Sequence, residues 1–170
     1  MRRGAVAAVA VVLAGCGGSG EQEARDRAVE ERMRYGQAVN GFCRDVSASV
    51  DRVQQDLSGA QGRAGDDVEA AAKAVGTALQ DFARSIGRAV DELRGAPVPA
   101  QYRGFHDRAV GGLGRVVGAL EQAGTRAEQG DLQGLAQLGT TLDDIEVPDP
   151  PADLRRAAPA CQDLSRLGAG

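Results

Sequence analysis

The sequence predicts an all-α protein that folds as an up-down-up-down helical bundle, with the fourth position split by a proline break and with one disulfide. Three observations lead to this prediction. Apolar residues recur every three or four positions over long stretches, and no stretch alternates apolar and polar residues as a strand does. The segments between these stretches are short and rich in glycine and proline, which favours antiparallel neighbours. The length of 170 residues allows one ordinary domain.

The first sixteen residues have the pattern of an export signal. Arg2 and Arg3 precede an uncharged run from Gly4 to Ala14, which is too short to span ~30 Å of hydrocarbon as a helix. The run ends in Leu13-Ala14-Gly15-Cys16, which resembles the lipobox of bacterial lipoproteins. The resemblance implies that residues 1–15 are a signal peptide, and that Cys16 carries acyl chains such as palmitate and anchors the protein on the extracytoplasmic side of the cell membrane. An ordinary signal peptide with a chance cysteine is the alternative.

Residues 16–34 are expected to form a tether and a charged helical stalk. The tether is the glycine-rich segment 17–20, and the stalk, 21–34, has Val29 and Met33 as its larger apolar side chains. Loss of the signal peptide would change the formal charge from −4 to −6. A negative body is expected to stand away from an anionic membrane surface.

Residues 35–170 are expected to form the bundle domain. Its first helix is predicted by apolar residues that recur three and four positions apart from Val39 to Leu57. Ser58-Gly59 is expected to end it, which makes residues 59–65 a loop. Asp66 is then expected to be the N-cap of the next helix, with Glu69 completing a capping box.

The second and third helices have the most regular patterns. The second repeats apolar residues in a 4-3 alternation from Val68 to Leu93 and is expected to stop at Gly95. The third follows the same rhythm from Tyr102 and ends near Gly130. Each is expected to have about 29 residues and to be ~43 Å long.

A shorter fourth helix, capped by Asp131, is predicted to extend to Ile145, and the prolines from Pro148 to Pro151 break it. A short fifth helix is expected to complete the fourth bundle position, with Leu154, Ala158, Cys161 and Leu164 on one side. This arrangement returns Cys161 to the part of the first helix that contains Cys43.

The cysteine count predicts the disulfide. If Cys16 is lipidated, Cys43 and Cys161 remain, and an even pair in an exported protein favours a disulfide. Such a bridge would close a loop of about 119 residues, which the chain-entropy model values at roughly 5 kcal/mol. Free thiols and pairing between chains are the alternatives.

Chemistry-bearing residues are few, and we expect no catalytic residue, metal site or cofactor. His106 is the only histidine, so sites that need two are excluded, and its place on an apolar seam favours a structural role over a base or a haem ligand. Acidic residues cluster around the proline break, without the ligand spacing of a calcium loop. They are Asp143, Asp144, Glu146, Asp149 and Asp153.

Glycine supplies the one candidate interaction surface. Gly104, Gly111, Gly114 and Gly118 fall on the side of the third helix away from the core seam. Each exposed helical glycine costs ~1 kcal/mol relative to alanine, so the strip favours a surface where a partner backbone approaches closely. Compositional drift and coverage by the fifth helix are the alternatives.

These observations favour a non-enzymatic lipoprotein that binds an envelope protein or a cell-wall component. Its acidic charge and its aromatic content of 3% argue against nucleic acid as a partner. The alternative function is a small-molecule binder or sensor with an apolar site between helices near Phe82, Phe105 and His106.

Overall fold

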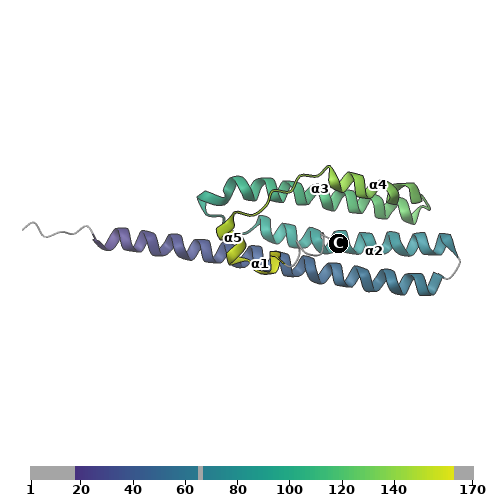
Figure 1. Ribbon diagram of the computed structural model, residues 1–170, viewed down its shortest axis with the longest axis horizontal. Helices are drawn as coiled ribbons and strands as arrows, with labels where there is room; N and C mark the ends of the chain where they lie inside the picture. The colour runs from purple at the N-terminus through teal and green to yellow at the C-terminus, as the bar shows by residue number, and fades with distance from the viewer. Residues whose placement is uncertain (1–17, 65–66, 163–170) are drawn as a thin grey trace, which may run out of the picture.

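The computed structural model describes residues 18–64 and 67–162. Its long helices are α1 (Gly18–Ala64), α2 (Val68–Arg94) and α3 (Arg103–Glu128), and its shorter ones are η1 (Ala100–Tyr102), α4 (Leu132–Asp143) and α5 (Ala152–Ala157). No strand occurs in these residues, and the predicted all-α bundle is confirmed. In Figure 1, α2 lies between α1 and α3, while α4 runs along α3.

The split fourth position is visible as two separate pieces. The helix α4 packs on α3, and the chain then returns along the bundle to α5, which packs on α1 near the point where α1 leaves the bundle (Figure 1). Residues of α1, α2, η1, α3 and α5, together with Ala158 just beyond α5, form the core, and Leu138 of α4 packs against it while partly buried. The buried core residues are Tyr35, Val39, Ala83, Ile86, Val90, Leu93, Tyr102, Val110, Leu120, Leu154 and Ala158.

The first helix is longer than predicted at both ends. It begins at Gly18, so the expected flexible tether is wrong for residues 18–20, while Gly17 lies outside the described residues. Glu21 occupies the first turn, where a negative side chain interacts favourably with the helix dipole. At 1.5 Å per residue the helix is ~70 Å long.

The expected loop at residues 59–65 is also wrong, because α1 continues to Ala64. Ser58 does not end the helix; its hydroxyl donates to the Gln54 carbonyl one turn back, at 2.8 Å. An isolated glycine weakens a helix by ~1 kcal/mol but keeps its backbone N–H, so helix propagation can pass through it.

The N-cap of α2 is Asp67, whose side chain accepts from the Ala70 backbone N–H at 3.0 Å. The prediction of Asp66 is therefore off by one residue, and Asp66 itself lies outside the described residues. The predicted ends at Gly95 and near Gly130 are confirmed, and Gly130 has a φ of 82°, which glycine adopts without strain. Asp131 caps α4 as predicted, by accepting from the Gln133 and Gly134 N–H groups.

The last two helices are shorter than predicted. The helix α4 ends at Asp143, because the chain from Asp144 onward leaves to cross α3 instead of extending toward Ile145. The helix α5 ends at Ala157, because Pro159 disfavours the helical conformation in the residue before it. Cys161 therefore lies beyond α5, in a short helical stretch over residues 160–162, and Leu164 lies outside the described residues.

The N-terminal part of α1 projects from the bundle. Every residue from 20 to 34 is exposed, whereas Tyr35 is completely buried. Figure 1 shows this purple segment extending past the other helices as one continuous rod with the rest of α1. We call residues 18–34 the stalk; they span ~25 Å.

Candidate functional site

The proposed lipidation site lies outside the described residues, as do the signal peptide 1–15 and the rest of the lipobox. The described part of the chain begins at Gly18, two positions after Cys16. Within it, no helix is both long enough and apolar enough to cross a membrane.

The predicted disulfide is confirmed. The Sγ atoms of Cys43 and Cys161 are 1.98 Å apart, and their Cα atoms are 5.0 Å apart. Beside the bridge, the Asn40 side-chain oxygen on α1 accepts from the Ala160 N–H at 2.9 Å. Leu154, only 1% exposed, adds an apolar contact to the core. The segment 153–161, which we call the clasp, is thus held against α1 at the end of the bundle from which the stalk leaves.

A cluster of aromatic and polar side chains lies under the clasp. Tyr102 donates a hydrogen bond to Asp153, and its ring stacks on Tyr35 with centroids 5.4 Å apart. The Tyr35 hydroxyl in turn lies 3.2 Å from Nδ1 of His106. Each of the four residues comes from a different element, so the cluster connects α1, η1, α3 and the clasp. His106 is 6% exposed, which places it in the core.

The environment of the cluster changes the acidity of its members. Burial, together with the neighbouring Tyr102 and Asp107, raises the pKa of Tyr35 to about 12. Burial and the bond to Asp153 also raise the pKa of Tyr102. The same bond lowers the pKa of Asp153, because the phenol donates to the charged carboxylate.

The raised pKa of Tyr35 predicts that the protein loses stability at alkaline pH. The ordinary tyrosine pKa of 10.0 applies to the unfolded chain, and the folded pKa of Tyr35 is about 12. Between these values the folded state binds more protons, so the free energy of unfolding falls as the pH rises from 10 to 12 and is unaffected by Tyr35 below 10. Denaturant unfolding across this window should show a shallower decline in Tyr35→Phe than in the parent. An equally steep decline would contradict the assignment.

The four predicted glycines lie on an open surface. A Cβ placed on Gly111, Gly114 or Gly118 would have no described neighbour within 4 Å, and one on Gly104 would meet only the end of the Arg108 side chain, at 3.7 Å. Coverage of the strip by the fifth helix is therefore wrong, since α5 packs on α1 instead.

Other glycines, which the sequence analysis did not single out, make the close contacts. A Cβ on Gly76 of α2 would lie 2.6 Å from the Gly124 carbonyl oxygen, and one on Gly124 would lie 2.9 Å from the Gly76 carbonyl oxygen. A Cβ on Gly112 would lie 2.6 Å from the carbonyl oxygen of Glu146, where the chain crosses α3. Their place on the buried faces of α2 and α3, beside small residues, was the signal in the sequence.

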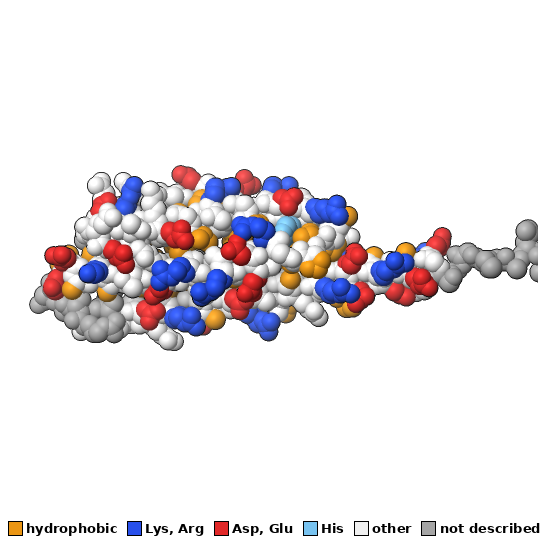
Figure 2. Space-filling model, turned by 180° about the vertical axis from the view of Figure 1, so that it is seen from behind, with side chains coloured by type: hydrophobic (Ala, Val, Ile, Leu, Met, Phe, Trp, Pro, Cys, Tyr) orange, Lys and Arg blue, Asp and Glu red, His pale blue; other side chains and the backbone are white. Residues whose placement is uncertain are grey.

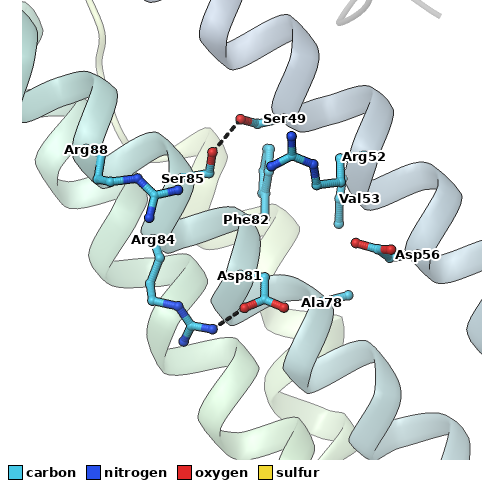
Figure 3. A pocket seen from close by; sticks show the side chains of 10 residues that line it. All are labelled: Ser49, Arg52, Val53, Asp56, Ala78, Asp81, Phe82, Arg84, Ser85 and Arg88. Atoms are coloured by element: carbon cyan, nitrogen blue, oxygen red, sulfur yellow. Dashed lines mark hydrogen bonds and ion pairs between the residues drawn. The ribbon is translucent and has the colours of Figure 1, made fainter.

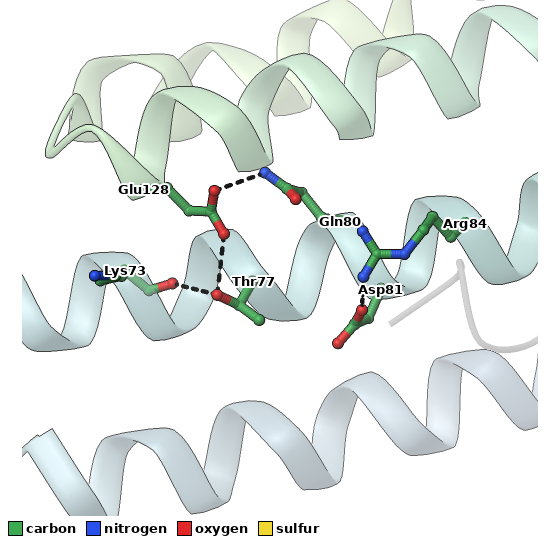
Figure 4. A network of polar contacts seen from close by, with 6 residues as sticks. All are labelled: Lys73, Thr77, Gln80, Asp81, Arg84 and Glu128. Carbon is green, nitrogen blue, oxygen red and sulfur yellow. Dashed lines mark hydrogen bonds and ion pairs between the residues drawn. The ribbon is translucent and has the colours of Figure 1, made fainter.

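The Gly76–Gly124 approach brings polar side chains of α2 and α3 together (Figure 4). Glu128 accepts hydrogen bonds from Thr77 at 3.0 Å and from Gln80 at 2.9 Å. Thr77 also lies 3.1 Å from the Lys73 carbonyl oxygen. These bonds fix the register of the two helices, which is a structural role.

Of the hollows on the described part of the bundle, two are lined by residues that the sequence had placed at an apolar site. The first, of about 230 Å³, lies between α1 and α2, where the hydroxyls of Ser49 and Ser85 are 2.7 Å apart (Figure 3). Phe82 lines it, together with Arg52 and other charged residues. In Figure 3, Asp81 is paired with Arg84 of the same helix.

The second hollow, which we call the α3 hollow, has a volume of about 520 Å³. It is lined by Arg94, His106, Asp107, Val110, Gly111, Gly114 and Arg115. Phe82 and His106 therefore line different hollows. Two of the predicted glycines line the α3 hollow, whereas the arginines beside them were not predicted.

Figure 2 shows one face of the molecule, on which acidic and basic side chains are interspersed. The pale blue histidine, the only one in the chain, is visible there beside basic side chains. In the described ranges, no three histidine, cysteine or acidic side chains are grouped so that they could hold a metal ion.

Comparison of the chain with protein-family models, with curated proteins and with solved structures found no match.

Proposed function

We propose that this protein is a lipid-anchored lipoprotein of the cell envelope, whose bundle is a non-enzymatic docking module for an envelope protein or a cell-wall component. The stalk is the observation that carries the proposal. It is exposed at every residue from 20 to 34 and is continuous with the first helix of the bundle. A helix of this kind has no use in stabilising the core, but it suits a domain held at a distance from an anchor at Cys16.

The continuity of α1 has a mechanical consequence. A glycine-rich tether would let the bundle sample all orientations relative to the membrane, whereas a helix transmits orientation along its axis. The stalk therefore holds the bundle ~25 Å from the anchor. The Glu30–Arg34 ion pair, at 2.5 Å, is one of the (i, i+4) contacts that support an exposed helix.

The roles of the reactive side chains support a non-enzymatic function. His106 is bonded through Nδ1 to a buried phenol, and Cys43 and Cys161 are joined to each other. In the described residues, neither group is part of a nucleophile–base pair of the kind that covalent catalysis needs.

The lipid anchor is tested by metabolic labelling with a fatty-acid analogue. We expect the parent chain to be labelled and to sediment with membranes, and Cys16→Ala to lose both properties because it has no thiol to acylate. Ser19→Ala is the matched control and should behave as the parent. Unchanged labelling of Cys16→Ala would overturn the proposed anchor.

Docking is tested in cells with a photo-crosslinking amino acid at Gly118, which lies on the open strip. The control position is Arg84, which lies on the exposed side of α2. We expect discrete adducts from position 118, and expect them to disappear when Cys16→Ala removes the anchor. A pattern of adducts identical at the two positions would argue against docking through α3.

A further inference from the structure

We propose that the α3 hollow binds a carboxylate group of the docked partner, with His106, Arg94 and Arg115 as its hydrogen-bond donors. This inference rests on the docking role proposed above and names the chemistry that the docking surface recognises. Three independent features of the hollow support this inference. They are an imidazole donor held in place, more basic than acidic lining side chains, and glycines that leave the α3 backbone uncovered.

The imidazole donor follows from the burial of Tyr35. This side chain is 0% exposed, and Nδ1 of His106 is the partner of its hydroxyl. The phenol keeps its proton at neutral pH, because burial raises its pKa to about 12. A buried hydroxyl without an acceptor for its proton is costly, so Tyr35 donates to Nδ1. Neutral His106 then carries its own proton on Nε2.

The Nε2–H group has no partner within the described residues, where Tyr35 is the hydrogen-bond partner of His106. The described residues also contain no buried side-chain nitrogen or oxygen that lacks a partner, so Nε2 must reach the surface. Since His106 is 94% buried and lines the α3 hollow, the hollow is where this atom emerges. The Nε2–H group of His106 is thus held in place by the core, faces the hollow and is available to donate a hydrogen bond.

Charge around this donor selects a monoanion. Among the side chains that line the hollow, Arg94 and Arg115 exceed Asp107 by one positive charge, before the ion pair of Arg94 with Asp91 is counted. Arg94 pairs with Asp91 on an exposed surface, where ion pairs exchange readily, and Arg115 reaches the Glu146 carbonyl oxygen at 3.4 Å. Arginine donors match the planar geometry of a carboxylate. A phosphate dianion would exceed the available charge and meet Asp107.

The glycines make the hollow accessible. A Cβ on Gly111 or Gly114 would meet no described atom within 4 Å, so the space above the α3 backbone is open. The hollow is open to solvent, and its volume of about 520 Å³ leaves room for a carboxylate with the residue that bears it. Larger side chains at these two positions would fill the same space.

The experiment uses the single histidine as a reporter. We would follow the imidazole ¹⁵N signals of the full-length chain in detergent while adding N-acetylglycine, with N-acetylglycinamide as the uncharged control probe. We expect the free protein to show the Nε2–H form, and expect the Nε2 signal to move with N-acetylglycine only. The Nδ1–H form in the free protein, or no movement with the carboxylate, would overturn the proposal.

Matched variants test the location. We expect Arg115→Gln to weaken N-acetylglycine binding about tenfold, because a charge-assisted bond is lost. Arg108→Gln removes the same charge from α3 outside the hollow and should change binding less than about twofold. Gly114→Ala should weaken binding, whereas Gly118→Ala, on the same strip but outside the hollow, should not. Equal effects within either pair would overturn the assigned site.

A third probe separates carboxylate recognition from general anion binding. Inorganic phosphate should move the Nε2 signal less than N-acetylglycine at equal concentration, and an equal or larger response would overturn the choice of a carboxylate. All these measurements use isolated protein, so they succeed or fail independently of the lipid anchor and of adducts formed in cells.

Discussion

Replacing Cys43 and Cys161 together by alanine is expected to lower the free energy of unfolding by roughly 2–5 kcal/mol. The bridge joins residues separated by 118 positions, so it constrains nearly the whole described chain in the unfolded state. The folded state depends on it as well, since most of the helical part of the clasp belongs to α5, a helix of only six residues. Such a helix is not stable alone, and without the bridge its attachment depends on a few contacts.

Denaturant unfolding followed by circular dichroism measures the change, with Cys16→Ala as the control because it removes a cysteine but keeps the bridge. Opening of the clasp should also expose Tyr35, which would lower the pKa of its hydroxyl toward the ordinary value of 10.0. A loss below about 1 kcal/mol would mean that the core alone holds the clasp in place.

Adding a single methyl group at Gly76 or Gly124 is expected to destabilise the protein by about 1–3 kcal/mol. At Gly76 the new Cβ would lie 2.6 Å from the Gly124 carbonyl oxygen and 2.7 Å from the Glu128 nitrogen. Backbone atoms cannot rotate away as the end of a side chain can, so α2 and α3 would have to separate. Separation would also strain the bonds from Thr77 and Gln80 to Glu128.

Gly111→Ala and Gly118→Ala are the matched controls for this prediction. They add the same methyl group to α3 where no described atom lies within 4 Å, so they should raise the free energy of unfolding by about 0.5–1 kcal/mol. Thermal or denaturant unfolding of the four single variants provides the comparison. Stabilisation by Gly76→Ala would show that the two helices can move apart without cost.

Local residue patterns were sufficient to predict most of the helices. The second helix was predicted from its 4-3 alternation and its glycine stop because both act within a few residues. The cap at Asp131 likewise involves only backbone groups two and three residues away. One error arose at Ser58-Gly59, which is too weak a stop signal to end a helix that continues to Ala64. Another arose after Asp143, where tertiary contacts competed with continuation of the helix.

The candidate site was only partly predictable. Gly111 and Gly114 were identified by their place on the side of one helix away from its core seam, but Arg94 reaches the same hollow from the end of α2. The bond between Tyr35 and His106 joins residues 71 positions apart, and it occupies Nδ1 of the imidazole. A periodic pattern holds information about one helix at a time, so it cannot identify such pairs.

The sequence by itself determined the helical class and the order of the helices, because helix periodicity is a property of the chain alone. It favoured the pairing of Cys43 with Cys161, which the structure then confirmed. Only the tertiary structure decided which glycines pack closely against another backbone and which face open space. Gly76 and Gly118 have the same intrinsic helix propensity, and what distinguishes them is the presence or absence of another backbone within 4 Å. That distance depends on how α2 and α3 pack together.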